Sequence, residues 1–286
     1  MRLGVVGMIP SDLSMIQAEH LEAVRKLDLT GFSVGQGREQ LFDVDRSACT
    51  RLRSLCADME MDLVQLNVGY GECLFHPEKD VRSRALETIE RGIEIGCAAG
   101  AFACLIRPGS MGDSPYAISL ENTLPGCRER LVETLRGVAD KAEAEGATIV
   151  IETHAVTIMD SPETNRDILQ QLGSDSMGVV MDFVNHFQSL EQVYNNTERL
   201  KHIYAVMGGL SPLGHCKDIK FGQGLVIHID EEIPGEGVLD METALRCWHE
   251  LCPDGYMLLE HLPDELYPQA SANVHRIASQ AKIEIH

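Results

Sequence analysis

The stretch VVMDFVNH, residues 179–186, begins as an apolar run and ends in residues suited to chemistry. Val179 and Val180 belong to an unbroken apolar segment, as is typical of a parallel strand buried on both faces. Asp182, Asn185 and His186 then follow within a few residues. We therefore expect Asp182 to mark the point where a central strand leaves the core.

The same unit recurs along the chain: a short run rich in Val, Ile or Leu, then polar residues, then a segment of helical periodicity. Segments 81–96 and 127–146 each place apolar residues on one helical face. Alternating strands and helices predict parallel pairing through right-handed crossovers. The eight apolar runs fall at residues 3–8, 31–36, 63–69, 102–108, 148–154, 178–186, 213–219 and 256–262.

Eight such units in 286 residues predict an α/β fold, a (β/α)8 TIM barrel that forms a single domain over residues 1–286. An open doubly wound sheet is the alternative, but the first strand lacks a G-x-G-x-x-G turn for a dinucleotide. The irregular segment 222–240 falls between strand seven and the next helix. It is long enough to cover one end of the barrel.

Four consecutive strands end in potential metal ligands. They are Glu152 in TIVIETH, Asp182, His215 in LGHCKDI and Glu260 in YMLLEHL. The active site of a barrel forms at the carboxyl ends of its strands, and carboxylates gathered there need a cation to offset desolvation. Oxygen donors with one imidazole predict a single divalent metal ion, manganese first, with cobalt, magnesium or zinc as alternatives.

As an ordered set on strands five to eight, IVIETH, VVMDFVNH, GHCKDI and LLEHL resemble the xylose isomerase-like TIM barrel family, which includes sugar phosphate isomerases and epimerases. The resemblance covers nearly the whole chain. It implies that Glu152, Asp182, His215 and Glu260 bind one metal. In the ketose 3-epimerase branch it also implies that the two glutamates act as acid and base on opposite faces of the substrate.

Two features of this chain differ from the pattern of the ketose 3-epimerase branch. A substrate-contacting histidine lies three residues after the aspartate there, whereas His186 lies four residues after Asp182. The branch also carries an arginine shortly after the strand-seven histidine, where this chain offers Lys217 and Lys220. We expect His186 and Lys217 to contact substrate, although Lys217 could instead form an ion pair with a neighbouring acid.

Three further residues are candidate substrate contacts. Arg107 ends strand four and suits an anionic group such as a carboxylate or phosphate, with a helix cap or a salt bridge as the alternative. His154 follows Glu152 by two residues and could support the metal site, bind substrate or face solvent. His76, after strand three, is a candidate for the rim of the pocket.

Such a site favours proton abstraction next to a carbonyl. A metal stabilises the resulting enolate, and a positioned carboxylate contributes about 10²- to 10⁴-fold as general base. Return of the proton to the opposite face gives an epimerase, and return to the neighbouring carbon gives an isomerase. We therefore expect a metal-dependent isomerase or epimerase of a sugar, sugar acid or polyol derivative. The alternative is a lyase, either a dehydratase or a decarboxylase of an oxidised sugar.

The composition of the chain disfavours several other classes of function. With 24 Lys plus Arg against 44 Asp plus Glu, the net charge of −20 disfavours nucleic acid as a partner and an abasic-site endonuclease as the activity. No apolar stretch approaches the roughly 20 residues that span a bilayer, so we expect no membrane association. A scaffold that lost catalysis is disfavoured because all four ligand positions are acidic or histidine.

Nine scattered cysteines without a C-x-x-C pair, and no signal peptide at the N-terminus, favour a cytoplasmic protein. The expected partner is a small carbohydrate substrate. The outer helix ring of a barrel also suits a homo-oligomer.

Overall fold

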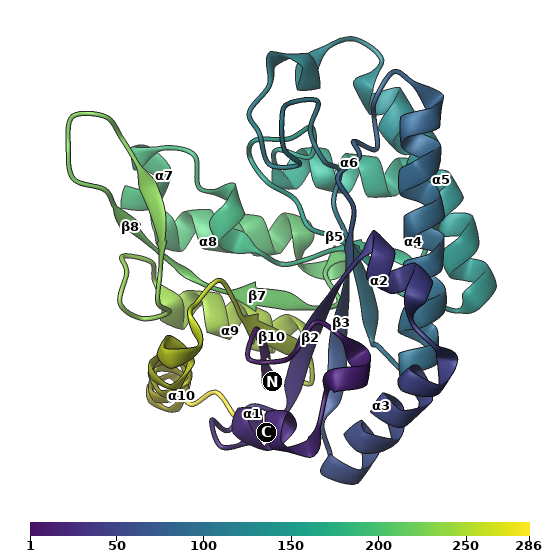
Figure 1. Cartoon of the computed structure of the whole chain (residues 1–286). Helices are drawn as coiled ribbons and strands as arrows, with labels where there is room; N and C mark the ends of the chain where they lie inside the picture. The colour runs from purple at the N-terminus through teal and green to yellow at the C-terminus, as the bar shows by residue number, and fades with distance from the viewer.

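The computed structural model describes all 286 residues, and eight of its strands form one curled parallel sheet surrounded by helices (Figure 1). The sheet order is β6-β5-β4-β3-β2-β1-β10-β7, and a parallel bridge between Met181 and Gly214 joins its two edges. This arrangement is a (β/α)8 barrel, as predicted. The barrel strands are β1 (Arg2–Val6), β2 (Gly31–Gly37), β3 (Asp62–Gly69), β4 (Ala103–Ile106), β5 (Ile149–Ile151), β6 (Met177–Val179), β7 (Gly214–Cys216) and β10 (Tyr256–Leu259).

Ten helices cover the sheet or connect its strands. Their apolar faces pack on the outer surface of the barrel, in a core cluster of 67 buried residues. No helix is both long and apolar enough to cross a membrane. The helices are α1 (Ala18–Arg25), α2 (Arg38–Asp43), α3 (Arg46–Met59), α4 (Lys79–Ala99), α5 (Cys127–Glu145), α6 (Pro162–Leu172), α7 (Leu190–Tyr194), α8 (Asn196–Met207), α9 (Met241–Leu251) and α10 (Tyr267–Ala281).

A second, smaller cluster fills the inside of the barrel. It contains eight buried side chains, among them Val150, Val180, Leu213 and Leu258. Each of these four lies two residues before one of the predicted metal ligands. Because alternate residues of a strand share a face, the packing of this cluster directs the ligands into the barrel.

The structure differs from the predicted elements at two strand ends. The segment Phe183–His186 is a 3-10 turn and not part of strand six. The residues after Cys216 leave the barrel and form an antiparallel hairpin of β8 (Asp218–Phe221) and β9 (Ile229–Glu232). This hairpin projects from the body of the molecule (Figure 1), and it occupies much of the segment expected to be irregular.

Candidate metal centre

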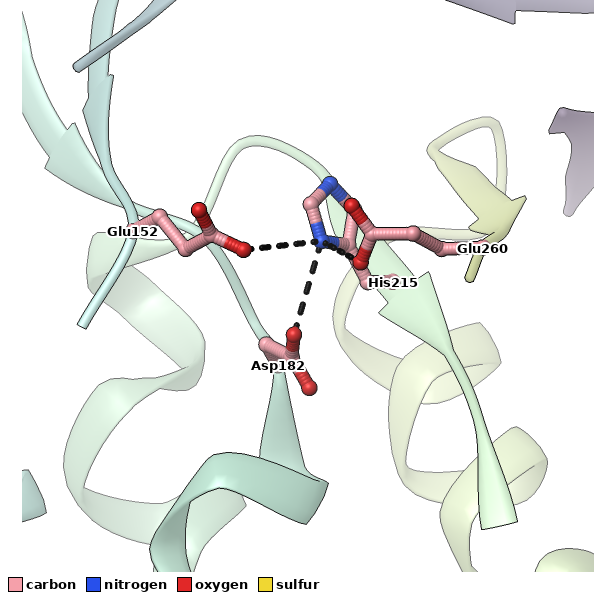
Figure 2. Close-up of side chains that lie close together, drawn as sticks. All are labelled: Glu152, Asp182, His215 and Glu260. Carbon is pink, nitrogen blue, oxygen red and sulfur yellow. Dashed lines mark ion pairs between the residues drawn. The ribbon is translucent and has the colours of Figure 1, made fainter. Parts of the chain in front are cut away.

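The four predicted ligands meet at the carboxyl end of the barrel. Glu152, Asp182, His215 and Glu260 are all buried, and they offer ligand atoms that lie within 4.8 Å of one another. His215 Nδ1 lies 2.8 Å from Glu260 Oε2, 3.5 Å from Asp182 Oδ2 and 4.0 Å from Glu152 Oε1 (Figure 2). The three carboxylates therefore converge on one nitrogen from three different strand ends.

The donor atoms of this cluster fit a cation. His215 Nδ1, Asp182 Oδ1 and Glu260 Oε2 are buried without a partner in hydrogen-bonding geometry. Polar atoms left in this state cost about 1–3 kcal/mol each, and more when charged. Three carboxylate donors and one imidazole form a ligand set that suits a divalent ion of intermediate hardness. The residues present therefore fit one metal ion.

Gln65 of β3 fixes the ring of His215. Its Oε1 lies 3.0 Å from His215 Nε2, while its Nε2 donates to Asn67 Oδ1. This bond directs Nδ1 of His215 toward the carboxylates. Our sequence prediction did not include Gln65, although a signal was present. Gln65 and Asn67 are polar residues at alternate positions of an apolar strand, which places both on its inner face.

Lys217 is a buried cation among the carboxylates. Its Nζ lies 2.7 Å from Asp182 Oδ2, 3.3 Å from Glu260 Oε2 and 3.0 Å from Glu231 Oε1. Burial alone would lower the pKa of Lys217, but the surrounding carboxylates outweigh burial and raise this pKa well above its ordinary value. Burial likewise opposes ionisation of Asp182, yet Lys217 and His215 lower its pKa to about 2. Both groups are therefore charged at neutral pH.

The β8–β9 hairpin contributes Glu231, which the sequence prediction also missed. Glu231 forms an ion pair with Lys217 and lies 2.9 Å from His261 Nδ1. His261 Nε2 in turn lies 3.6 Å from Glu260 Oε1. The backbone of His261 has a φ of 58°, a left-handed conformation that is uncommon outside glycine. The hairpin thereby orients an imidazole beside one of the predicted catalytic glutamates.

A second imidazole lies beside the other predicted catalytic glutamate. His154 Nε2 is 3.8 Å from Glu152 Oε2. The ring of Tyr116 meets the ring of His154 edge-on at a centroid distance of 5.2 Å, and the guanidinium of Arg107 lies 5.3 Å from the centre of Tyr116. Tyr116 comes from the loop between β4 and α5, and nothing in its sequence context marked it as part of the site.

The structure does not bring His186 and His76 into this cluster. His186 is fully buried, and its Nε2 lies 3.3 Å from the hydroxyl of Thr153, which accepts from Asn165 of α6. The ring of His76 accepts from the backbone N–H of Glu78 in the loop before α4. Neither ring contacts one of the four candidate ligands.

Comparison with known proteins agrees with this architecture. The family model described as xylose isomerase-like TIM barrel matches residues 21–278. No curated protein matches the sequence. Because the family model covers most of the chain, the protein belongs to the xylose isomerase-like TIM barrel family.

Solved structures of low sequence identity share the fold. A D-tagatose 3-epimerase-like protein has a TM-score of 0.75 at 16% identity, covering 99% of this chain and 98% of its own. An L-ribulose 3-epimerase has a TM-score of 0.75 at 15% identity, with 98% and 95% coverage. The 3-keto-D-glucoside 4-epimerase of E. coli has a TM-score of 0.71 at 15% identity, with 96% and 99% coverage. At these identities, the likeness establishes the fold.

Proposed function

We propose that this protein is a divalent-metal-dependent isomerase or epimerase of a small sugar, sugar acid or polyol derivative, working by proton abstraction next to a carbonyl. One observation carries the proposal: the buried group of Glu152, Asp182, His215 and Glu260, whose ligand atoms lie within 4.8 Å of one another. Structural neighbours that act on sugars as 3- and 4-epimerases support the same class of reaction.

The proposed cofactor is one metal ion held by these four residues. When bound, it supplies positive charge that stabilises the enolate oxygen formed as the proton leaves. Manganese suits the donor set best, and cobalt, magnesium and zinc are alternatives. A structural neighbour from Mycobacterium smegmatis was solved with magnesium, which supports a divalent ion of this kind.

Glu152 and Glu260 are the proposed acid and base. They extend from β5 and β10, on two sides of His215 (Figure 2). Each has an imidazole nearby, His154 for Glu152 and His261 for Glu260. A carboxylate on each side of a bound substrate can remove a proton from one face and return it to the other, which inverts the carbon.

Lys217, His154 and Arg107 are the proposed substrate contacts. Lys217 also keeps Asp182 and Glu260 ionised, as their lowered pKa values indicate. We leave His186 and His76 out of this proposal because their rings have other partners. The lyase alternative uses the same proton abstraction, followed by loss of a β-hydroxyl or carboxyl group.

All nine cysteines are free, and none is exposed. This state suits a reducing compartment, and we propose the cytoplasm as the location.

The test combines metal analysis with proton exchange. Wild-type protein, Glu152→Gln and Glu260→Gln would be analysed for metal by mass spectrometry and incubated in D2O with a panel of ketoses and sugar acids. Glu163→Gln is the matched control, because Glu163 lies on the surface of α6 and pairs with His202. We expect one equivalent of metal in the wild type and deuterium incorporation next to the carbonyl.

Each glutamate variant should lower deuterium incorporation by at least about 10²-fold, because it removes a general acid or base. The control variant should exchange like the wild type. Absence of metal from the wild type, or exchange in both glutamate variants at the wild-type rate, would show that the four-residue site is not the catalytic centre.

A further inference from the structure

Arg107 lies at the mouth of the barrel, the carboxyl end of its strands, and has no anionic partner there. The two lysines at this end of the barrel form ion pairs, Lys217 with three carboxylates and Lys220 with Glu232. The guanidinium of Arg107 forms no ion pair, and its Nε is buried without a hydrogen-bond partner. An unpaired charged donor is costly in a folded protein unless water or a ligand accepts from it.

The β4–β5 register places Arg107 beside Glu152. Leu105 pairs with Val150, so the residues two positions further on, Arg107 and Glu152, lie at the same level and on the same face. The backbone of Arg107 is held by the buried Tyr70, whose hydroxyl accepts from its N–H at 2.9 Å and donates to its carbonyl at 2.5 Å. Arg107 is thus anchored next to a candidate metal ligand.

The loop between β4 and α5 orients the guanidinium. Its carbon lies 5.3 Å from the centre of the Tyr116 ring, and Tyr116 in turn contacts His154 beside Glu152. A guanidinium that contacts an aromatic ring in this way still has N–H groups that can donate to a planar acceptor. Carboxylate and phosphate oxygens match this edge with two parallel hydrogen bonds.

We propose that Arg107 and Tyr116 form a subsite for an anionic group of the substrate, a carboxylate or a phosphate. This inference rests on the proposed function and deepens it, since it narrows the substrate from sugars in general to sugar acids or sugar phosphates. The two lysines at this end of the barrel are already neutralised, Lys217 by Asp182, Glu231 and Glu260 and Lys220 by Glu232, so Arg107 is the cation left to pair with an anion. The anionic end of the substrate therefore lies on the β4 side of the site.

Calorimetric titration tests this inference without relying on turnover. Manganese-loaded wild type, Arg107→Gln and Arg107→Lys would each be titrated with 5-keto-D-gluconate, D-fructose 6-phosphate and D-fructose. Arg276→Gln is the matched control, because Arg276 is an exposed residue of α10 outside the site. Tyr116→Leu tests the contribution of the aromatic contact.

We expect wild-type protein to bind one of the two anionic ligands at least about tenfold more tightly than D-fructose. Arg107→Gln should weaken binding of that anion by about 10- to 100-fold, the usual effect of losing charged hydrogen bonds, and should thereby remove the preference. Arg107→Lys should restore it only in part, because an ammonium cannot form the two-pronged contact. Tyr116→Leu should reduce the preference severalfold, and Arg276→Gln should retain it.

Preference for the keto acid would identify a sugar acid, and preference for the phosphate ester would identify a sugar phosphate. Equal affinity of the wild type for D-fructose and both anions, or an equal loss for all three ligands in Arg107→Gln, would overturn the inference. Failure of the proposed function is distinguished by the metal analysis and deuterium exchange, neither of which depends on which ligand binds more tightly.

Discussion

His186 is a buried histidine whose environment disfavours its charged form. Burial lowers the pKa of His186 to about 4, although Asp182 partly opposes the shift. An unfolded chain would bind a proton at the ordinary pKa of about 6.5. Because the unfolded state then binds more protons than the folded state, stability is full above pH 6.5 and is lost as the pH falls toward 4.

We predict that the titration of His186 alone lowers the free energy of unfolding by about 2 kcal/mol when the pH falls from 7 to 5. Urea denaturation at the two pH values measures the loss. His186→Gln should be less stable than the wild type at pH 7 but should lose about 2 kcal/mol less on acidification. The exposed His228 provides the control, since His228→Gln should keep the wild-type dependence. An unchanged pH dependence in His186→Gln would contradict the assignment.

The residues that the sequence predicted and those it missed differ in how they reach the site. Glu152 and Glu260 follow apolar strands directly, Asp182 comes shortly after one and His215 lies within one, so the strand pattern alone places all four at one end of the barrel. Tyr116 and Glu231 reach the site from a loop and a hairpin, whose paths depend on tertiary packing. His186 lies in sequence beside a ligand, but a 3-10 turn directs its ring to Thr153 instead.

The buried carboxylate of Asp218 holds the hairpin segment, residues 218–240, in its conformation. Asp218 Oδ1 accepts from the N–H groups of Ile219 and Leu239, and its Oδ2 accepts from those of Gly235 and Gly237. A Cβ atom at Gly237 would overlap Asp218, so this turn requires glycine. Asp218 thus connects the end of β7 to the far end of the hairpin segment.

We predict that Asp218→Asn destabilises residues 229–240 by about 2–4 kcal/mol, because an amide nitrogen would face two buried N–H donors. Hydrogen-exchange mass spectrometry should show faster exchange in this segment than in the barrel strands. The control is Asp45→Asn, since Asp45 caps α3 at the surface and asparagine caps helices equally well. Protection of residues 229–240 equal to that of the wild type would rule out this role of Asp218.

The elements themselves follow the sequence pattern closely, except where strands end. Each of the eight apolar runs overlaps a barrel strand, because burial on both faces selects the same residues that the pattern shows. Run 213–219 was predicted as one strand, but Lys217 separates β7 from β8. The hairpin is held by antiparallel pairing between β8 and β9 and by Asp218, and neither feature has an apolar periodicity to reveal it.

In the molecule as a whole, packing inside the barrel affects both the stability of the fold and the geometry of the candidate metal centre. The chain termini meet, since the Met1 amino group donates to the carbonyl of Glu284, and β1 pairs with both β2 and β10. The apolar cluster inside the barrel lies one layer below the ligands. Leu258 pairs in register with His215 and precedes Glu260 by two residues on the same face. Packing of this layer therefore sets the positions of two ligands at once.

We predict that Leu258→Ala lowers the free energy of unfolding by about 2–5 kcal/mol, because it leaves a cavity in a fully buried layer. The matched control is Leu225→Ala, the same substitution at the fully exposed tip of the hairpin, which should change stability by less than about 0.5 kcal/mol. Chemical denaturation measures both. Manganese affinity, measured by calorimetry on the folded variants, should fall for Leu258→Ala alone, since the ligands above the cavity lose their support. Unchanged affinity in a destabilised Leu258→Ala would show that the two layers act independently, and the ligand positions would then have to be fixed by Gln65 and Lys217 alone.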